Sequence, residues 1–546
     1  MATQTLETPR VAGAKTPPEA SPVTAAPAQF RTNPYLGVLG VFCGAGIATL
    51  NARLLGIGLA DLRGAMGFGF DEASWLPTAL NMATMFSGVF VCFLNIIYGP
   101  RRILLPAAAL FALVSFALPF APGYNSMLAM VVIAGLTAGT FYSLTMTFVV
   151  AALPKKLIIF GIAAYAADIV FVSNIASLLE GWYIDALSWR WIFWTAAVVT
   201  PLMMIFVYFG VPPRPAGDTR PSWRGFAYFS LGLALLYGAL DQGERLDWFN
   251  SGIIVAMLAA GVFLLLAALV RRLTQPNPVV NLAFLNRRNT IILSLSIFFF
   301  KFSHLATVVL IPNFLGSVSR YGQLETGRAL AWVAIPMFAV VWLVALFALN
   351  VNARATLAGG LAVAAIACWR CSQLDSTWAG NSFQAIELVL ACGFACTYIG
   401  LVANIVLEGL EAGALTSMMN AATFSGLMHF IRIFGGQVGV TFMTRVLTVR
   451  EKFHSNLLGL HVSAGNWTTG ERLQMLTAAM FGKSAGLDEA QFRAAGILGA
   501  QVRAQAFTMA VSDGFITICW MIVAYLLLMA FLRPPRFSYQ DLRRMK

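Results

Sequence analysis

The chain has 546 residues, of which 59% are hydrophobic and only 11% are charged, and its mean hydropathy is +0.76. Because a soluble domain carries charge on roughly a quarter of its residues, this composition excludes a soluble globular protein. The net charge of +13 would indicate a nucleic-acid partner in a soluble protein. Here the basic residues gather in short segments between apolar runs, which indicates topology signals and contacts with anionic lipid, with no nucleic-acid partner.

Residues 1–33 are rich in Pro, Ala and Thr and lack the apolar block of a signal peptide, so we expect a disordered cytoplasmic tail. Beyond them, apolar runs long enough to cross a bilayer as helices follow one another. The predicted fold class is therefore an all-α polytopic membrane protein. It has about fourteen spans of roughly 20 residues, expected near 34–60, 74–97, 103–121, 126–151, 157–179, 190–210, 225–240, 252–270, 289–313, 328–349, 355–373, 382–407, 415–447 and 505–532.

The basic residues lie in alternate loops. Arg101–Arg102, Lys155–Lys156 and the C-terminal tail 533–546 belong to one set of loops. The positive-inside rule therefore predicts that both termini lie in the cytoplasm. The expected location is the plasma membrane, which is the inner membrane in a cell that has two, and the chain crosses it several times. Two longer connections are expected, an outer loop at 448–504 and a cytoplasmic one that includes an interfacial helix near 279–285.

A polar stretch, LDQGERLDWFNS at 240–251, separates the seventh and eighth predicted spans on the outer face. Gly243 permits a tight turn there, and the amphipathic indole of Trp248 suits the water interface. Its acidic residues are expected to form local ion pairs or helix caps, and they are Asp241, Glu244 and Asp247.

This stretch resembles the signature loop of the fourteen-span drug:proton antiporters of the EmrB/QacA type, a branch of the major facilitator superfamily. Further segments are similar to that branch, namely Ser188–Phe193, Pro278–Phe284, Arg432 with Gly435, Gly436 and Gly439, His454, and Asp513 with Phe515. The resemblance covers about residues 34–535, and the chain is identified as a divergent member of the branch.

The resemblance implies the major facilitator fold, in which two six-helix bundles surround a midplane cavity and rock to give alternating access. The bundles are expected at 34–210 and 289–532, the second including the outer loop, with an inserted helix pair at 211–288. The implied function is a secondary active transporter, a proton-coupled exporter of amphipathic small molecules or drugs. The implied partners are a small-molecule substrate, protons and the lipid bilayer, and in a two-membrane cell also a periplasmic adaptor and an outer-membrane channel.

Several positions depart from the pattern of that branch. The expected gating loop keeps Gly99 and Arg101–Arg102. Three positions that carry charges in the branch are uncharged here, and they are Asn51 in the first span, Ile96 before the gating loop and Val131 in the fourth span. Transport is still expected, whereas the coupling mechanism differs from the usual one.

Charges inside membrane spans are costly and usually face a cavity or a partner. In the N-terminal half these charges are Arg53 and Asp61 in the outer part of the first span and Asp168 near the middle of the fifth. Our hypothesis is that Arg53 and Asp168 face a common cavity near Asn51 and pair in a protonation-dependent way. Asp168 would then carry the proton, and the alternative is a static structural pair.

In the C-terminal half, Lys301 shares a helical face with His304, and His429 shares one with Arg432. These four are secondary candidates for coupling, and packing or hydrogen bonding is the alternative role for the histidines. Two aromatic residues of the fourth span are weak candidates for contact with substrate, with core packing as the commoner role, namely Phe141 and Tyr142.

The sequence contains no Walker loop, HExxH or GxSxG motif and no convincing metal cluster. We therefore expect no enzyme, no cofactor and no bound metal. Two alternatives to a drug exporter stay open. One is a dedicated exporter of a metabolite or siderophore with atypical coupling, which the missing charges favour, and the other is a non-transporting membrane sensor or scaffold.

Overall fold

The computed structural model of the protein describes residues 33–154, 157–213, 223–274, 287–348, 351–411, 418–463 and 465–532. Every regular element in these ranges is a helix, as the predicted all-α class requires. The tail at 1–32, the C-terminal tail 533–546 and the predicted interfacial helix near 279–285 lie outside the described residues.

The first bundle contains six long helices and the short α2 (Leu59–Met66) that follows the first of them. The long helices are α1 (Pro34–Ile57), α3 (Phe70–Tyr98), α4 (Pro100–Ala117), α5 (Tyr124–Ala152), α6 (Ile158–Trp182) and α7 (Trp191–Gly210). Glycines bring their backbones together, since a side-chain carbon on Gly135 of α5 would lie 2.4 Å from the carbonyl oxygen of Leu80 in α3. Small residues at such crossings are how helices pack closely in lipid.

The second bundle is built in the same way. It contains α11 (Arg288–Leu305), which continues through a π turn (Ala306–Leu310) into α12 (Ile311–Ser317), α13 (Gln323–Ala348), α14 (Ala353–Cys371), α15 (Gly380–Glu411), α16 (Met418–Gly459) and α18 (Leu487–Met529). A side-chain carbon on Gly360 of α14 would lie 2.3 Å from the backbone nitrogen of Thr397 in α15.

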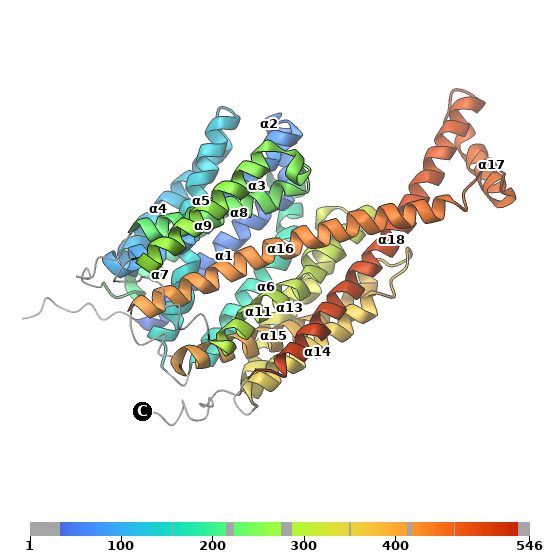
Figure 1. The fold of residues 1–546 in the computed structure, drawn as a ribbon. Coiled ribbons are helices and arrows are strands. Elements are labelled where there is room, and N and C mark those ends of the chain that lie inside the picture. The colour runs from blue at the N-terminus through green and yellow to red at the C-terminus, as the bar shows by residue number, and fades with distance from the viewer. Residues whose placement is uncertain are drawn as a thin grey trace, which may run out of the picture.

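The inserted pair consists of α8 (Trp223–Gly243) and α9 (Gly252–Thr274), joined by the predicted turn. Helix α8 packs against α3 of the first bundle and α16 of the second, and α9 packs on α8. Eleven described helices are long and apolar enough to cross a membrane. Helices α8, α14 and α16 run alongside them (Figure 1), so the described helices agree with the predicted architecture of about fourteen spans.

The segment predicted as a long outer loop at 448–504 is mostly helical. Helix α16 continues to Gly459, α17 covers Trp467–Phe481, and α18 begins at Leu487, so that these helices project from the rest of the molecule (Figure 1). Polar contacts support the extension, because Asp513 of α18 accepts hydrogen bonds of 2.6 Å from both Arg450 and His454 of α16. Hydropathy marks where a helix leaves the membrane and does not mark where the helix ends.

The two ends of the bundle differ in how closely the halves approach. We call the end with the α8–α9 turn and α17 the hairpin face, and the end where α1 begins and α18 ends the termini face. Near the hairpin face, a side-chain carbon on Gly181 of α6 would lie 2.3 Å from the backbone nitrogen of Leu324 in α13. One on Gly327 of α13 would lie 2.2 Å from that of Leu178 in α6. The backbones therefore touch there.

Toward the termini face, aromatic side chains separate the same two helices. The rings of Phe171 and Phe338 have centroids 4.7 Å apart, and those of Phe160 and Trp342 lie 6.4 Å apart. The halves thus make backbone contact near the hairpin face and are spaced by aromatic side chains toward the termini face.

Candidate functional site

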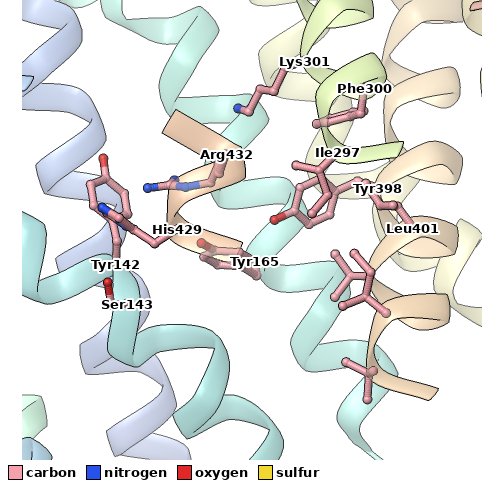
Figure 2. A pocket seen from close by; sticks show the side chains of 13 residues that line it. Tyr142, Ser143, Tyr165, Ile297, Phe300, Lys301, Tyr398, Leu401, His429 and Arg432 are labelled. Atoms are coloured by element: carbon pink, nitrogen blue, oxygen red, sulfur yellow. The ribbon is translucent and has the colours of Figure 1, made fainter. Parts of the chain in front are cut away.

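A cavity lies between the two halves (Figure 2). Its described lining comes from α5, α6, α11, α15 and α16, and consists of Tyr142, Ser143, Tyr165, Ile297, Phe300, Lys301, Tyr398, Leu401, Val402, Ile405, Val406, His429 and Arg432. Ile405 and Val406 lie near the end of α15 at the termini face. The cavity therefore extends from the middle of the bundle toward that face.

A second cavity lies beside the first, toward α1 and α3. Asn51, Asn81 and Thr84 are among its polar lining residues. Tyr142, Lys301 and Arg432 line both cavities, so these three side chains form the boundary between them.

Arg432 of α16 contacts Tyr142 of the first bundle. Figure 2 shows its guanidinium pointing toward Tyr142, and the guanidinium carbon lies 3.8 Å from the centre of that ring. A cation over an aromatic face is attracted by the quadrupole of the ring, most strongly where water is excluded. The Tyr142 hydroxyl also shares a hydrogen bond of 2.6 Å with Thr49 of α1. Arg432 is thereby held at the contact between the halves, and none of the ion pairs within the described ranges includes it.

His429, one turn before Arg432, has a packing role in this structure. Its Nε2 lies 3.3 Å from the carbonyl oxygen of Thr84 in α3. A side-chain carbon on Gly88 would lie 2.0 Å from the same nitrogen, so the imidazole fills a notch that only glycine provides. The fit indicates a structural histidine at the contact between α3 and α16.

Lys301 lies thirteen residues into α11, about 20 Å from the start of that helix at 1.5 Å per residue. Its amine lies 6.0 Å from the centre of the Phe300 ring. His304, one turn further, is buried, and neither ring nitrogen has a hydrogen-bond partner among the residues that the structure describes. Its ring packs edge-on against Phe394, with centroids 5.3 Å apart.

Asp168 and Arg53 do not form the direct ion pair of our hypothesis in this structure. None of the ion pairs found within the described ranges includes either residue. Asp168 instead packs against α1, where a side-chain carbon on Gly46 would lie 2.6 Å from its Oδ1. Asp168 Oδ2 and Arg53 Nε are buried without a hydrogen-bond partner in the described part of the chain.

The charges that act on them nevertheless lie at the cavity. Asp168 is attracted by the charge of Arg432, whereas Arg53 and Lys301 are both cations and repel each other. The described lining of the two cavities contains the cations Lys301 and Arg432 and no Asp or Glu. With Arg53 and Asp168 beside it, the site holds three cations and one carboxylate, which is an excess of positive charge.

The remaining predicted residues lie outside this cluster or at its edge. Asn51 lines the second cavity, and Asp61 is exposed on α2. Phe141 is fully buried within the first bundle, where its ring packs edge-to-face against Phe111 with centroids 5.5 Å apart. Of the two aromatic candidates, Tyr142 lines both of these cavities and Phe141 lines neither.

The predicted gating loop joins α3 to α4 at the termini face. Gly99 adopts a φ of 77°, a conformation that favours glycine. The Arg101 guanidinium lies 4.4 Å from the centre of the Tyr208 ring in α7, whereas Arg102 is exposed. The turn is thus built into the first bundle.

Sequence reasoning did not single out Tyr165 and Tyr398, which line the first cavity from opposite halves. Their rings have centroids 6.0 Å apart. The signal that could have found Tyr165 is a lone tyrosine in the small-residue run Ala163–Ala167, three residues before Asp168. The sequence also suggests a solvated Glu180 at the outer end of the fifth predicted span; this expectation is wrong, because the side chain is buried near the hairpin face.

Comparisons of the sequence and of the structure with known proteins agree on one family and one fold. The family model of the Major Facilitator Superfamily matches residues 41–431. The multidrug export protein EmrB of Haemophilus influenzae is 24% identical, over 89% of this chain and 93% of that protein. The fatty acid resistance protein FarB of Neisseria gonorrhoeae is 22% identical, over 90% and 94%. Among solved structures, the proton:xylose symporter XylE superposes with a TM-score of 0.56 at 11% identity, covering 94% of this chain and 98% of that one.

Proposed function

Since the chain belongs to the major facilitator superfamily, we propose that it is a proton-coupled exporter of amphipathic small molecules that carry a negative charge. It moves them by alternating access between its two halves. The negative charge of the substrate is inferred from the excess of positive charge around the cavities, where Arg53, Lys301 and Arg432 outnumber Asp168.

Uncompensated cations inside a membrane protein are expensive, and they usually face a ligand, a partner or water. Lys301 and Arg432 line the space itself, so a bound anion compensates them directly. The rest of the lining suits an apolar tail, because it includes several aliphatic side chains, namely Ile297, Leu401, Val402, Ile405 and Val406. The relatives support this choice, since one is a multidrug export protein and another a fatty acid resistance protein.

Asp168 is our proposed proton-binding group. It is the carboxylate beside the cavity, and its Oδ2 has no hydrogen-bond partner among the described residues. A proton on Asp168 and an anion in the cavity favour each other electrostatically, since each reduces the cost of the other. For proton antiport, the proton on Asp168 must therefore act by changing the conformation of the transporter. It does not act by competing with the substrate for the cavity. An anion leaving a cell with a negative interior is also driven by the membrane potential, by about 2.3 kcal/mol per charge per 100 mV.

The orientation belongs to the same proposal. The basic loops put the termini face in the cytoplasm and the hairpin face outside. The cavity that extends toward the termini face then takes substrate from the cytoplasm. The projecting helices carry exposed apolar side chains, with Leu460 76%, Trp467 75% and Phe492 81% accessible. In a two-membrane cell this projection is our proposed contact for a periplasmic adaptor that leads to an outer-membrane channel.

Flux measurements in vesicles test the proposal. Two fluorescent amphiphiles with the same apolar tail, one ending in a sulfonate and one in a quaternary ammonium, are followed under an imposed pH gradient. We expect flux of the sulfonate, accelerated at least about tenfold by the gradient, which corresponds to 1.4 kcal/mol. Equal flux of the cationic probe would contradict the charge assignment. Flux that is the same with and without the pH gradient would contradict proton coupling. Absence of flux for both probes would favour the two alternatives, a dedicated exporter of a metabolite or siderophore or a non-transporting membrane sensor or scaffold.

A further inference from the structure

Asp241 of α8 binds both halves of the molecule with its two carboxylate oxygens. Thr78 of α3, in the first bundle, donates a hydrogen bond to Oδ2. Gln437 of α16, in the second bundle, donates one of 2.8 Å to Oδ1. These partners lie 163 and 196 residues away in sequence. The inserted pair is therefore joined to both bundles through one side chain.

Neighbouring residues of α8 and the α8–α9 turn repeat the pattern toward the first bundle. Gln242 Nε2 donates a hydrogen bond of 3.0 Å to the carbonyl oxygen of Ser74 in α3. Arg245 forms an ion pair with Asp71 at the start of the same helix. Both contacts lie near the hairpin face.

The same segment is bonded to the second bundle through α16. The Tyr237 hydroxyl donates a hydrogen bond of 2.9 Å to Gln437 Oε1, which fixes the amide that reaches Asp241. Glu244 forms an ion pair of 2.9 Å with Arg445 of α16. We call residues 237–245, which make these contacts to α3 and α16, the α8 bridge.

The α8 bridge opposes opening of the hairpin face during alternating access. Opening the hairpin face requires α3 and α16 to separate there, because they belong to different halves. One carboxylate cannot follow both helices, so opening breaks at least one of the two Asp241 hydrogen bonds. Hydrogen bonds to an ionised group are stronger than those between neutral groups. The free-energy cost of breaking one of them therefore favours the closed form.

We propose that Asp241 is a positioning residue that holds the hairpin face closed, and that the inserted pair sets the balance between the two transport conformations. This inference rests on the alternating access of the proposed function and not on the identity of the substrate. It differs from the expectation of purely local pairs in this stretch. Asp247 does behave locally, since its Oδ2 accepts a hydrogen bond of 2.7 Å from Asn250.

The test measures how often the hairpin face opens. A reporter cysteine replaces Asn81, which lines the second cavity on α3, in a background with the seven native cysteines removed. The rate of its labelling by a membrane-impermeant thiol reagent, added at the hairpin face, reports opening and needs no transported substrate. Failure of the flux experiment therefore leaves this measurement interpretable.

Four variants are compared. Asp241→Asn removes the charge, and Gln437→Glu places a second carboxylate opposite Asp241, so each is expected to raise the labelling rate about tenfold. The double variant Asp241→Asn with Gln437→Glu restores a donor facing a carboxylate and is expected to return toward the parent rate. Asp247→Asn is the matched control and is expected to change nothing.

The double variant separates positioning from a general loss of packing, because only a specific bond is rescued by exchanging its two ends. Thermal unfolding in detergent shows whether each variant is folded, and if Asp241→Asn is not, Gln437→Glu and the double variant still decide. Labelling of Asp241→Asn at the parent rate would overturn the inference. So would a double variant that opens as often as Gln437→Glu alone.

Discussion

Replacing Arg432 by Gln is expected to lower transport of an anionic amphiphile at least about 100-fold, as expected for loss of about 3 kcal/mol from a buried charged contact. The reason is its position at the boundary of both cavities, where its guanidinium carbon lies 3.8 Å from the centre of the Tyr142 ring and it forms no direct ion pair within the described residues. Initial rates of sulfonate-probe flux in vesicles measure the effect. Arg432→Lys keeps the charge but not the planar contact with Tyr142, so it is expected to retain part of the activity.

The control for this variant is another arginine of the second bundle. Arg370 is exposed and donates a hydrogen bond of 2.7 Å to Gln373 near the hairpin face. Arg370→Gln is expected to transport at the parent rate. Parent-rate flux by Arg432→Gln would remove Arg432 from the binding site, provided that the protein amounts in the vesicles are matched.

Asp168→Asn is expected to lose the acceleration by a pH gradient while it still binds the anionic probe. Asn has the shape of a protonated Asp, so it fits against Gly46 and leaves the cations of the cavity without a competing negative charge. The probe is therefore expected to bind at least as tightly as it does to the parent protein. Flux under an imposed gradient and equilibrium binding in detergent give the two readouts.

A second acidic residue makes the comparison specific. Asp61 is exposed on α2, so Asp61→Asn is expected to leave both readouts unchanged. A normal response of Asp168→Asn to the pH gradient would show that another group carries the proton. Weaker probe binding in this variant would show that the carboxylate itself contributes to the site.

The fold was predictable because each helix that spans a membrane needs an apolar run of bilayer length, which can be found in the sequence. Apolar runs of bilayer length predict the spans, and the stretch 240–251 indicates the family and the inserted pair. The helices that continue into water were not predictable in this way. The polar ends of α16 and α18 are stabilised by contacts such as that of Asp513 with His454, between residues far apart in sequence.

Part of the candidate site was predictable residue by residue, and the pairing of its residues was less so. The cost of charge in a span identified Arg432 and Lys301, and the structure places both at the two cavities. The same rule identified Arg53 and Asp168, but helical periodicity does not show which faces of two distant helices meet. The contacts of Asp241 with Thr78 and Gln437 were not predictable for the same reason, because the three residues lie on three different helices.

The claim that the cavity binds an amphipathic anion is tested most directly by equilibrium binding to the purified protein. The sulfonate and ammonium probes with the same tail are titrated in detergent, with the parent protein and Arg432→Gln side by side. We expect saturable binding of the sulfonate, at least about tenfold weaker binding of the cation, and loss of sulfonate binding in the variant. Equal or tighter binding of the cationic probe, undisturbed by Arg432→Gln, would contradict the account.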